Sequence, residues 1–194
     1  MNNLIIKKKK YVFLLTLTLL GILCGIIFIT FISKDDKYVL VKELDLFFKN
    51  TDKINYIETF KTCLLNNFIS IIILYILAIS IIGIPFILLF LFVKGFIVGF
   101  SISSIINTYK FKGILYQFAY LFPHKFLLLI IYILLGFYSI NFSIRLFKSL
   151  FLKEDIILSK YFLNLNKVFV LSIIICFICS LLETFLCPLL IKII

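Results

Sequence analysis

Long apolar runs separated by short polar segments dominate the chain. The first run extends from Tyr11 to Ile32, directly after lysines at 7–10, and residues 33–67 form the only long polar stretch. Further apolar runs cover 68–104, 126–147 and 168–190. A membrane-spanning helix needs about 20 predominantly apolar residues, and these runs lack the alternating pattern of a transmembrane barrel. The pattern predicts an all-α, polytopic membrane helix bundle.

The run from 68 to 104 is too long for one straight crossing. Its ~37 residues would make a helix about 55 Å long, nearly twice the hydrocarbon thickness. The chain has two candidate turns, Gly83-Ile84-Pro85 and Lys94-Gly95. A turn at Gly83 leaves Lys94 near the membrane centre, at a cost of roughly 2.5–3.5 kcal/mol. The sequence therefore favours a turn at Lys94, with Gly83 and Pro85 kinking one long helix.

The next segment is harder to fit across a bilayer. Residues 95–108 would form a helix of only about 21 Å, and the apolar stretch 113–122 ends at Pro123. We expect a short or discontinuous element near 95–122, shielded by the rest of the bundle. With it, the chain has about five spans and forms a single integral-membrane domain over residues 1–194.

The distribution of charge predicts the orientation. Lysines cluster at 7–10 and in the segment 148–167, whereas 33–67 holds six lysines and six acids. By the positive-inside rule, the N-terminus and 148–167 are cytoplasmic. The segment 33–67 is then an external loop with an amphipathic helix from Ile54 onward, and the C-terminus is also external. The cations behind the net charge of +11 flank apolar runs, so they predict contact with membrane lipids rather than nucleic acid.

Small residues recur at four-residue spacing in two predicted spans. Gly21 and Gly25 lie in the first, and Gly95, Gly99 and Ser103 lie in the third. Such faces let helix backbones approach closely. They predict either packing within the bundle or binding of helices from a partner protein.

Glu183 is the only acid inside a predicted span. An ionisable residue in a membrane is costly and points to function or to a buried partner. One interpretation is a proton or ion relay. The favoured one is a structural pair with His124 or Lys125, which approach from the same outer side. Pro188 follows Glu183 and is expected to break the last helix.

The sequence offers little for catalysis. The only histidine is His124, and no H-E-x-x-H, P-loop, G-x-S-x-G or G-x-G-x-x-G is present. Four of the five cysteines lie in apolar runs and are interpreted as packing residues, with a redox or metal role for Cys176 and Cys179 as the alternative. We therefore predict no catalytic residues, metal, cofactor or small-molecule substrate, and no enzyme.

An ordered series of short motifs resembles one family. G-x-P at Gly83, K-G-x-x-x-G from Lys94, P-H at Pro123 and E-x-x-x-x-P from Glu183 follow one another in this order. The series resembles the stage II sporulation protein M family, and the resemblance covers about residues 45–190. The lead into the second span, "FKTCLLNNF", is also similar to that family.

The resemblance implies a non-catalytic membrane scaffold of endospore-forming bacteria. Its expected partners are two peptidoglycan hydrolases, stage II sporulation proteins D and P. The expected location is the cell membrane, at the sporulation septum and the engulfing mother-cell membrane, as part of a cell-wall remodelling complex that drives engulfment.

Two other functions remain open from the residues alone. One is a small transporter or channel subunit with Glu183 on the path. The other is an intramembrane hydrolase that uses His124.

Overall fold

The computed structural model describes residues 2–49, 55–80, 82–121, 124–153 and 157–193. The described residues are almost entirely helical and contain five helices long and apolar enough to cross a membrane, which confirms the predicted fold class. The elements are α1 (Asn2–Phe31), α2 (Lys34–Lys49), α3 (Tyr56–Ile79), α4 (Gly83–Leu121), α5 (His124–Phe151), α6 (Leu158–Leu181), the π-helical turn η2 (Leu182–Leu186) and α7 (Cys187–Ile193).

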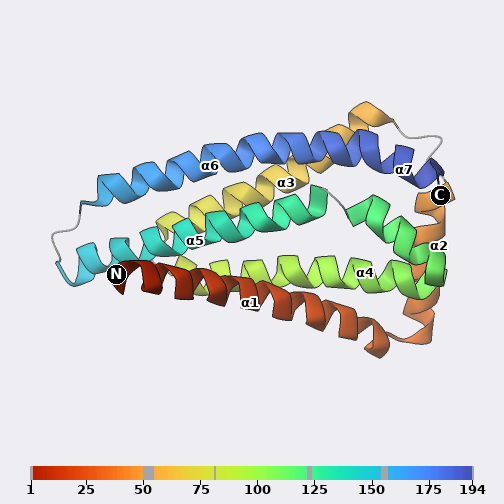
Figure 1. The fold of residues 1–194 in the computed structure, drawn as a ribbon, viewed down its shortest axis with the longest axis horizontal. Helices are drawn as coiled ribbons and strands as arrows, with labels where there is room; N and C mark the ends of the chain where they lie inside the picture. The colour runs from red at the N-terminus through yellow and green to blue at the C-terminus, as the bar shows by residue number, and fades with distance from the viewer. Residues whose placement is uncertain (1, 50–54, 81, 122–123, 154–156, 194) are drawn as a thin grey trace.

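The long helices lie side by side along one direction (Figure 1). The N-terminus and the α5–α6 connection are at one end of the bundle, and α2 lies across the other end, close to the C-terminus. This places the segments predicted to be cytoplasmic at the end opposite α2. The side of the bilayer on which each end lies stays a prediction.

The segment 33–67, predicted to be external, contains more helix than the sequence suggested. α2 begins at Lys34, where the Ser33 hydroxyl accepts a hydrogen bond from the Asp36 backbone N–H at 3.2 Å. The amphipathic stretch predicted from Ile54 onward forms the first turns of α3, which begins at Tyr56. Ile54 itself lies outside the described residues.

The turn between the second and third spans is at Gly83, so the favoured turn at Lys94 was wrong. The Gly83 N–H donates to the Ser80 carbonyl at 3.1 Å, and the Ser143 hydroxyl of α5 donates to the same carbonyl at 2.8 Å. A Cβ at Gly83 would lie 1.8 Å from the Leu77 carbonyl oxygen, so only glycine fits there. Pro85 lies in the first turn of α4, where its missing N–H costs nothing.

The discontinuity predicted near 95–122 exists and is at Lys110. This residue has φ 50° and ψ −121° inside α4, whereas Lys94 and Gly95 lie within continuous helix. After Lys110 the chain turns back toward the middle of the bundle, where α5 begins (Figure 1). The first part of α4, about 40 Å long, is a full crossing, and the second part re-enters. Pro123, predicted to break the helix here, lies outside the described residues.

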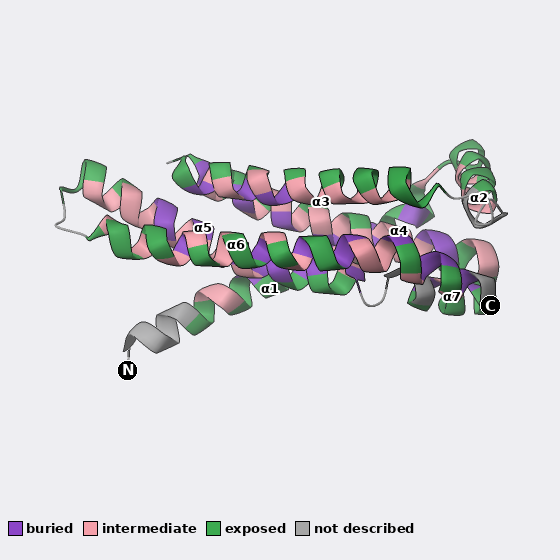
Figure 2. Cartoon of the chain, turned by 90° about the horizontal axis from the view of Figure 1, so that it is seen from above, coloured by how far each residue is buried: buried purple, intermediate pink, exposed green. Residues whose placement is uncertain are grey.

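α5 is the central helix of the bundle. It packs against α3, α4 and α6, and its buried residues include Leu128, Tyr132 and Leu135. The other helices bury one face and expose apolar side chains on the opposite face (Figure 2). In a membrane those exposed faces contact lipid, so the interior of the bundle is the place to look for polar chemistry.

Candidate functional site

The two glycine-containing faces pack against each other in the same chain. A Cβ at Gly21 would lie 2.3 Å from the Phe92 carbonyl oxygen of α4, and one at Gly99 would lie 2.0 Å from the Ile22 carbonyl oxygen of α1. Such distances are far inside van der Waals contact, so the two backbones touch. Gly25 and Gly95 are equally close to the facing helix.

Ser103 extends this contact by one more turn. Its hydroxyl donates to the Ile26 carbonyl of α1 at 3.1 Å. All five predicted small residues therefore belong to one α1–α4 interface. The alternative that this face receives a partner's helix is wrong in this structure, because α1 already occupies it.

Glu183 is paired with Lys125, the contact predicted from the sequence. Lys125 Nζ lies 2.5 Å from Glu183 Oε1, and the two side chains are 27% and 13% exposed. The Asn67 amide of α3 donates to Glu183 Oε2 at 3.5 Å and to the Ser180 hydroxyl at 3.4 Å. These contacts join α3, α5 and the last span at one depth.

His124 completes the surroundings of the carboxylate. Its ring is fully buried, with Nε2 3.8 Å from Glu183 Oε1 and Nδ1 3.5 Å from Cys187 Sγ. Within the described residues, no group of three or more His, Cys, Asp or Glu side chains is placed to hold a metal ion. The arrangement is a hydrogen-bonded ion pair enclosed by helices.

The π-helical turn η2 determines where Glu183 points. The Cys187 N–H donates to the Leu182 carbonyl, one residue farther back than in an α-helix. Pro188 follows in α7 and is buried. A proline ring clashes with the carbonyl four residues before it, and one wide turn relieves this clash. The prediction that Pro188 breaks the helix was thus wrong, since the helix widens and continues.

Lys94 lies inside the bundle, with its ammonium held by a hydroxyl and two aromatic rings. Nζ donates to the Ser70 hydroxyl of α3 at 2.7 Å and lies 5.3 Å from the ring centroids of Phe90 and Tyr132. Cation–π contacts contribute ~0.5–2 kcal/mol each when desolvated. Together with the hydrogen bond they offset much of the insertion cost that argued for a turn here.

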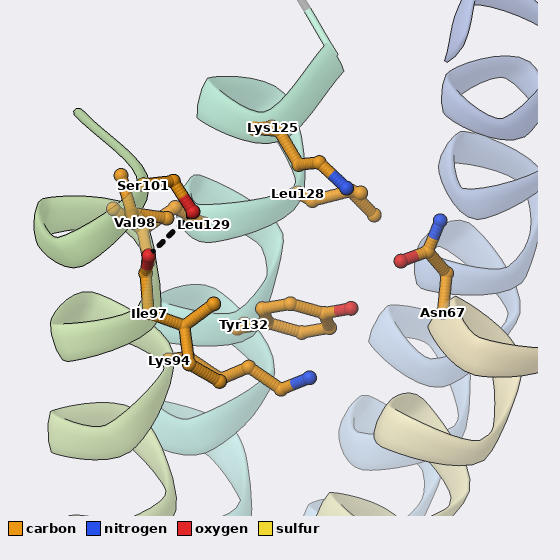
Figure 3. A pocket seen from close by; sticks show the side chains of 9 residues that line it. All are labelled: Asn67, Lys94, Ile97, Val98, Ser101, Lys125, Leu128, Leu129 and Tyr132. Carbon is orange, nitrogen blue, oxygen red and sulfur yellow. Dashed lines mark hydrogen bonds between the residues drawn. The ribbon is translucent and has the colours of Figure 1, made fainter. Parts of the chain in front are cut away.

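A cavity of about 130 Å³ lies between Lys94 and the ion pair. The polar ends of Lys94, Tyr132, Asn67 and Lys125 point toward this space from α4, α5 and α3 (Figure 3). The Ser101 hydroxyl, also at its wall, donates to the Ile97 carbonyl of its own helix at 2.9 Å. The structure thus places Lys94 and Lys125, the ion-pair partner of Glu183, around one cavity.

Sequence reasoning missed the residues that make Lys94 tolerable. These residues are Ser70, Phe90 and Tyr132. All three lie in apolar runs and carry no charge, so nothing in the sequence singles out any of them. Lys94 itself could have pointed to them, because a lysine inside a membrane span needs polar or aromatic neighbours at the same depth.

The comparisons with known proteins give one match. A family model described as Stage II sporulation protein M matches residues 13–188, from the first spanning helix to the proline after η2. No curated protein and no solved structure matches this chain.

Proposed function

The chain belongs to the stage II sporulation protein M family, and from that premise we propose that it is a non-catalytic scaffold. It is a sporulation-related membrane protein with five helices able to span the bilayer. In the proposal, it recruits peptidoglycan hydrolases, the stage II sporulation proteins D and P, to the septal membrane. There, and later at the engulfing mother-cell membrane, the assembled complex remodels the cell wall during forespore engulfment.

The observation that carries this proposal is α2, a helix laid across one end of the bundle (Figure 1). It is fixed to the membrane part by the Tyr109 hydroxyl, which donates to Asp45 Oδ1 at 2.5 Å. Three of its large apolar side chains are exposed: Tyr38, Val39 and Leu46. A helix attached to the bundle end, with exposed apolar residues, offers a docking surface to proteins outside the membrane.

Partner recovery tests the proposal. The tagged full chain is purified from sporulating cells and the copurifying proteins are identified. We expect both hydrolases, and we expect Tyr38→Ala to reduce their recovery without changing membrane insertion. Phe111→Ala is a matched control, because Phe111 is also an exposed aromatic residue, 89% exposed, just past the kink of α4. Recovery of the wild type without either hydrolase contradicts recruitment.

The proposal also requires α2 to lie outside the cell membrane. Single cysteines at Asn55 and Ser159, both exposed, report the two ends of the bundle in a cysteine-free background. We expect an impermeant thiol reagent to label position 55 and not position 159 in intact cells. Labelling of position 159 would refute the orientation.

The polar cavity favours a second candidate, a small transporter or channel subunit that uses Glu183. In this case Glu183 would exchange partners while an ion passes, whereas the structure shows it bonded to Lys125 and Asn67. Flux into proteoliposomes that is lost in Glu183→Gln supports this candidate, and absence of flux favours the scaffold.

A further inference from the structure

We propose that the cavity between Lys94 and Lys125 binds a small monovalent anion, such as a halide or a short carboxylate. The site would lie inside the helix bundle, between α3, α4 and α5. It is independent of the scaffold proposal, because an anion bound there would complete the bundle whether or not hydrolases dock on α2.

The first observation is the charge of Lys94. Among the described residues its ammonium has one hydrogen-bond acceptor, the Ser70 hydroxyl, and no acid at ion-pair distance. An ammonium has three donors, and a hydroxyl and two ring faces supply no neutralising charge. Lys94 therefore lacks a counter-ion among the described residues, and an anion beside it would favour its charged form.

The second observation is Tyr132, which lies between the two lysines. Its side chain is almost fully buried, at 4% exposed. Its hydroxyl has no partner of good hydrogen-bond geometry within the described parts of the chain, and its one polar neighbour is the Ser70 hydroxyl. Because the Tyr132 hydroxyl points toward the cavity (Figure 3), it can donate a hydrogen bond to an acceptor bound there.

The charges around the cavity do not balance. Lys94 and Lys125 bring two positive charges to the cluster, and Glu183 brings one negative charge that is already engaged by Lys125. The Asn67 amide N–H groups are already engaged by Glu183 and Ser180, and its oxygen faces the cavity (Figure 3). The cluster is thus short of one negative charge when both lysines are charged, which favours an anion of charge −1 near Lys94 over a cation.

The size of the cavity limits the ligand. A volume of about 130 Å³ accommodates a few water-sized groups, at about 30 Å³ each. A chloride with one or two waters, or formate or acetate, fits this space. A gluconate or a phospholipid headgroup does not, which gives the experiment its negative control.

The test uses the purified full chain in lipid nanodiscs. Sodium chloride replaces sodium gluconate at constant ionic strength, while the unfolding temperature and the line width of the chloride NMR signal are followed. We expect chloride to raise the unfolding temperature saturably and to show protein-dependent broadening. Formate should displace it, and gluconate should have no effect. Broadening or stabilisation that is no larger than in empty nanodiscs would overturn the site.

Variants assign the binding to this cavity. Lys94→Met should weaken chloride binding by at least about tenfold, the factor that corresponds to ~1.4 kcal/mol, and Tyr132→Phe should weaken it several-fold. Lys94→Arg keeps the charge and should retain binding, which makes it informative even if Lys94→Met does not fold. Lys160→Met, at an exposed lysine outside the cavity, is the matched control. Unchanged binding in both Lys94→Met and Tyr132→Phe, or equal loss in the Lys160 variant, would overturn the assignment.

Discussion

The α1–α4 interface and the cluster around Glu183 hold the same bundle together by opposite means. Between α1 and α4 the two backbones touch, and glycine is present because any side chain would collide with a carbonyl. Around Glu183 the helices are joined by side chains alone, through an ion pair and amide and hydroxyl contacts. The first interface depends on volume, and the second depends on charge and hydrogen bonding.

This difference follows from what the membrane supplies. Lipid tails are as apolar as leucine side chains, so helices gain little from apolar contact as such. Close backbone approach and polar contacts are the two remaining sources of specificity. This chain uses the first between α1 and α4 and the second among α3, α5 and the last span. Substitutions should therefore separate the two regions: added volume should disrupt α1–α4, and altered charge should disrupt the Glu183 cluster.

The largest effect is expected for Gly99→Leu. The added Cβ alone would meet the Ile22 carbonyl oxygen at 2.0 Å, so α1 must move away from α4. Overpacking of a core typically costs ~1–3 kcal/mol, and a collision with backbone should reach or exceed the upper end. Reversible unfolding in mixed micelles measures the change. Ile97→Leu, half-exposed on the same helix, should be close to neutral, and equal stability of the two variants would contradict the packing.

The second-largest loss of stability is expected for substitutions of Glu183, in the cluster that it forms with Lys125 and Asn67. Glu183→Leu removes the carboxylate that accepts from both Lys125 and Asn67 and should cost about 3 kcal/mol, as for a broken buried pair. Glu183→Gln keeps an acceptor of the same shape. Because Lys125 is 27% exposed, its ammonium can also turn toward water. We therefore expect this variant to lose only about 1 kcal/mol of unfolding free energy. The same unfolding measurement ranks both variants. A glutamine variant as unstable as the leucine variant would mean that charge, and not hydrogen bonding, holds this region.

A stabilising change is expected at the kink of α4. Lys110 has φ 50° and ψ −121°, a backbone conformation that costs a residue with a Cβ of order 1–3 kcal/mol. Lys110→Gly should therefore raise the free energy of unfolding by about 1 kcal/mol, after allowing for the greater entropy of glycine in the unfolded chain. Lys112→Gly, two residues later in helix, should lower it. Equal shifts in both variants would contradict the strain at Lys110.

The smallest change in the free energy of unfolding is expected at Ser103, which combines close packing with a hydrogen bond. Ser103 is small enough for the α1–α4 contact and also donates to the Ile26 carbonyl. Ser103→Ala keeps the size and loses one hydrogen bond, which within membranes contributes about 0.6 kcal/mol on average. Ser103→Val adds volume and should cost more. Should alanine prove as costly as valine, the polar contact would outweigh packing at this interface.

Sequence patterns predicted the parts of the molecule that depend on hydrophobicity and spacing. The five helices, the small-residue faces and the pairing of Glu183 with Lys125 all follow from apolar length, four-residue spacing and shared depth. The sequence prediction placed the turn at Lys94 instead of Gly83 because it took the full cost of inserting a lysine into the membrane. In the structure, contacts of Lys94 with Ser70, Phe90 and Tyr132 offset much of that cost. The discontinuity at Lys110 lies within the predicted range 95–122, whereas the π-turn before Pro188 is a backbone adjustment that the hydrophobic pattern does not predict.

The central claim is that the intramembrane charge cluster is structural and that the protein acts by assembling partners. The most direct test is engulfment in sporulating cells that carry Glu183→Gln as the only copy, with its abundance matched to the wild type. The account predicts that engulfment proceeds and that both hydrolases copurify with the variant. Loss of engulfment by a folded, normally abundant Gln variant that still recovers both hydrolases would contradict it, and would assign the carboxylate to ion or proton movement.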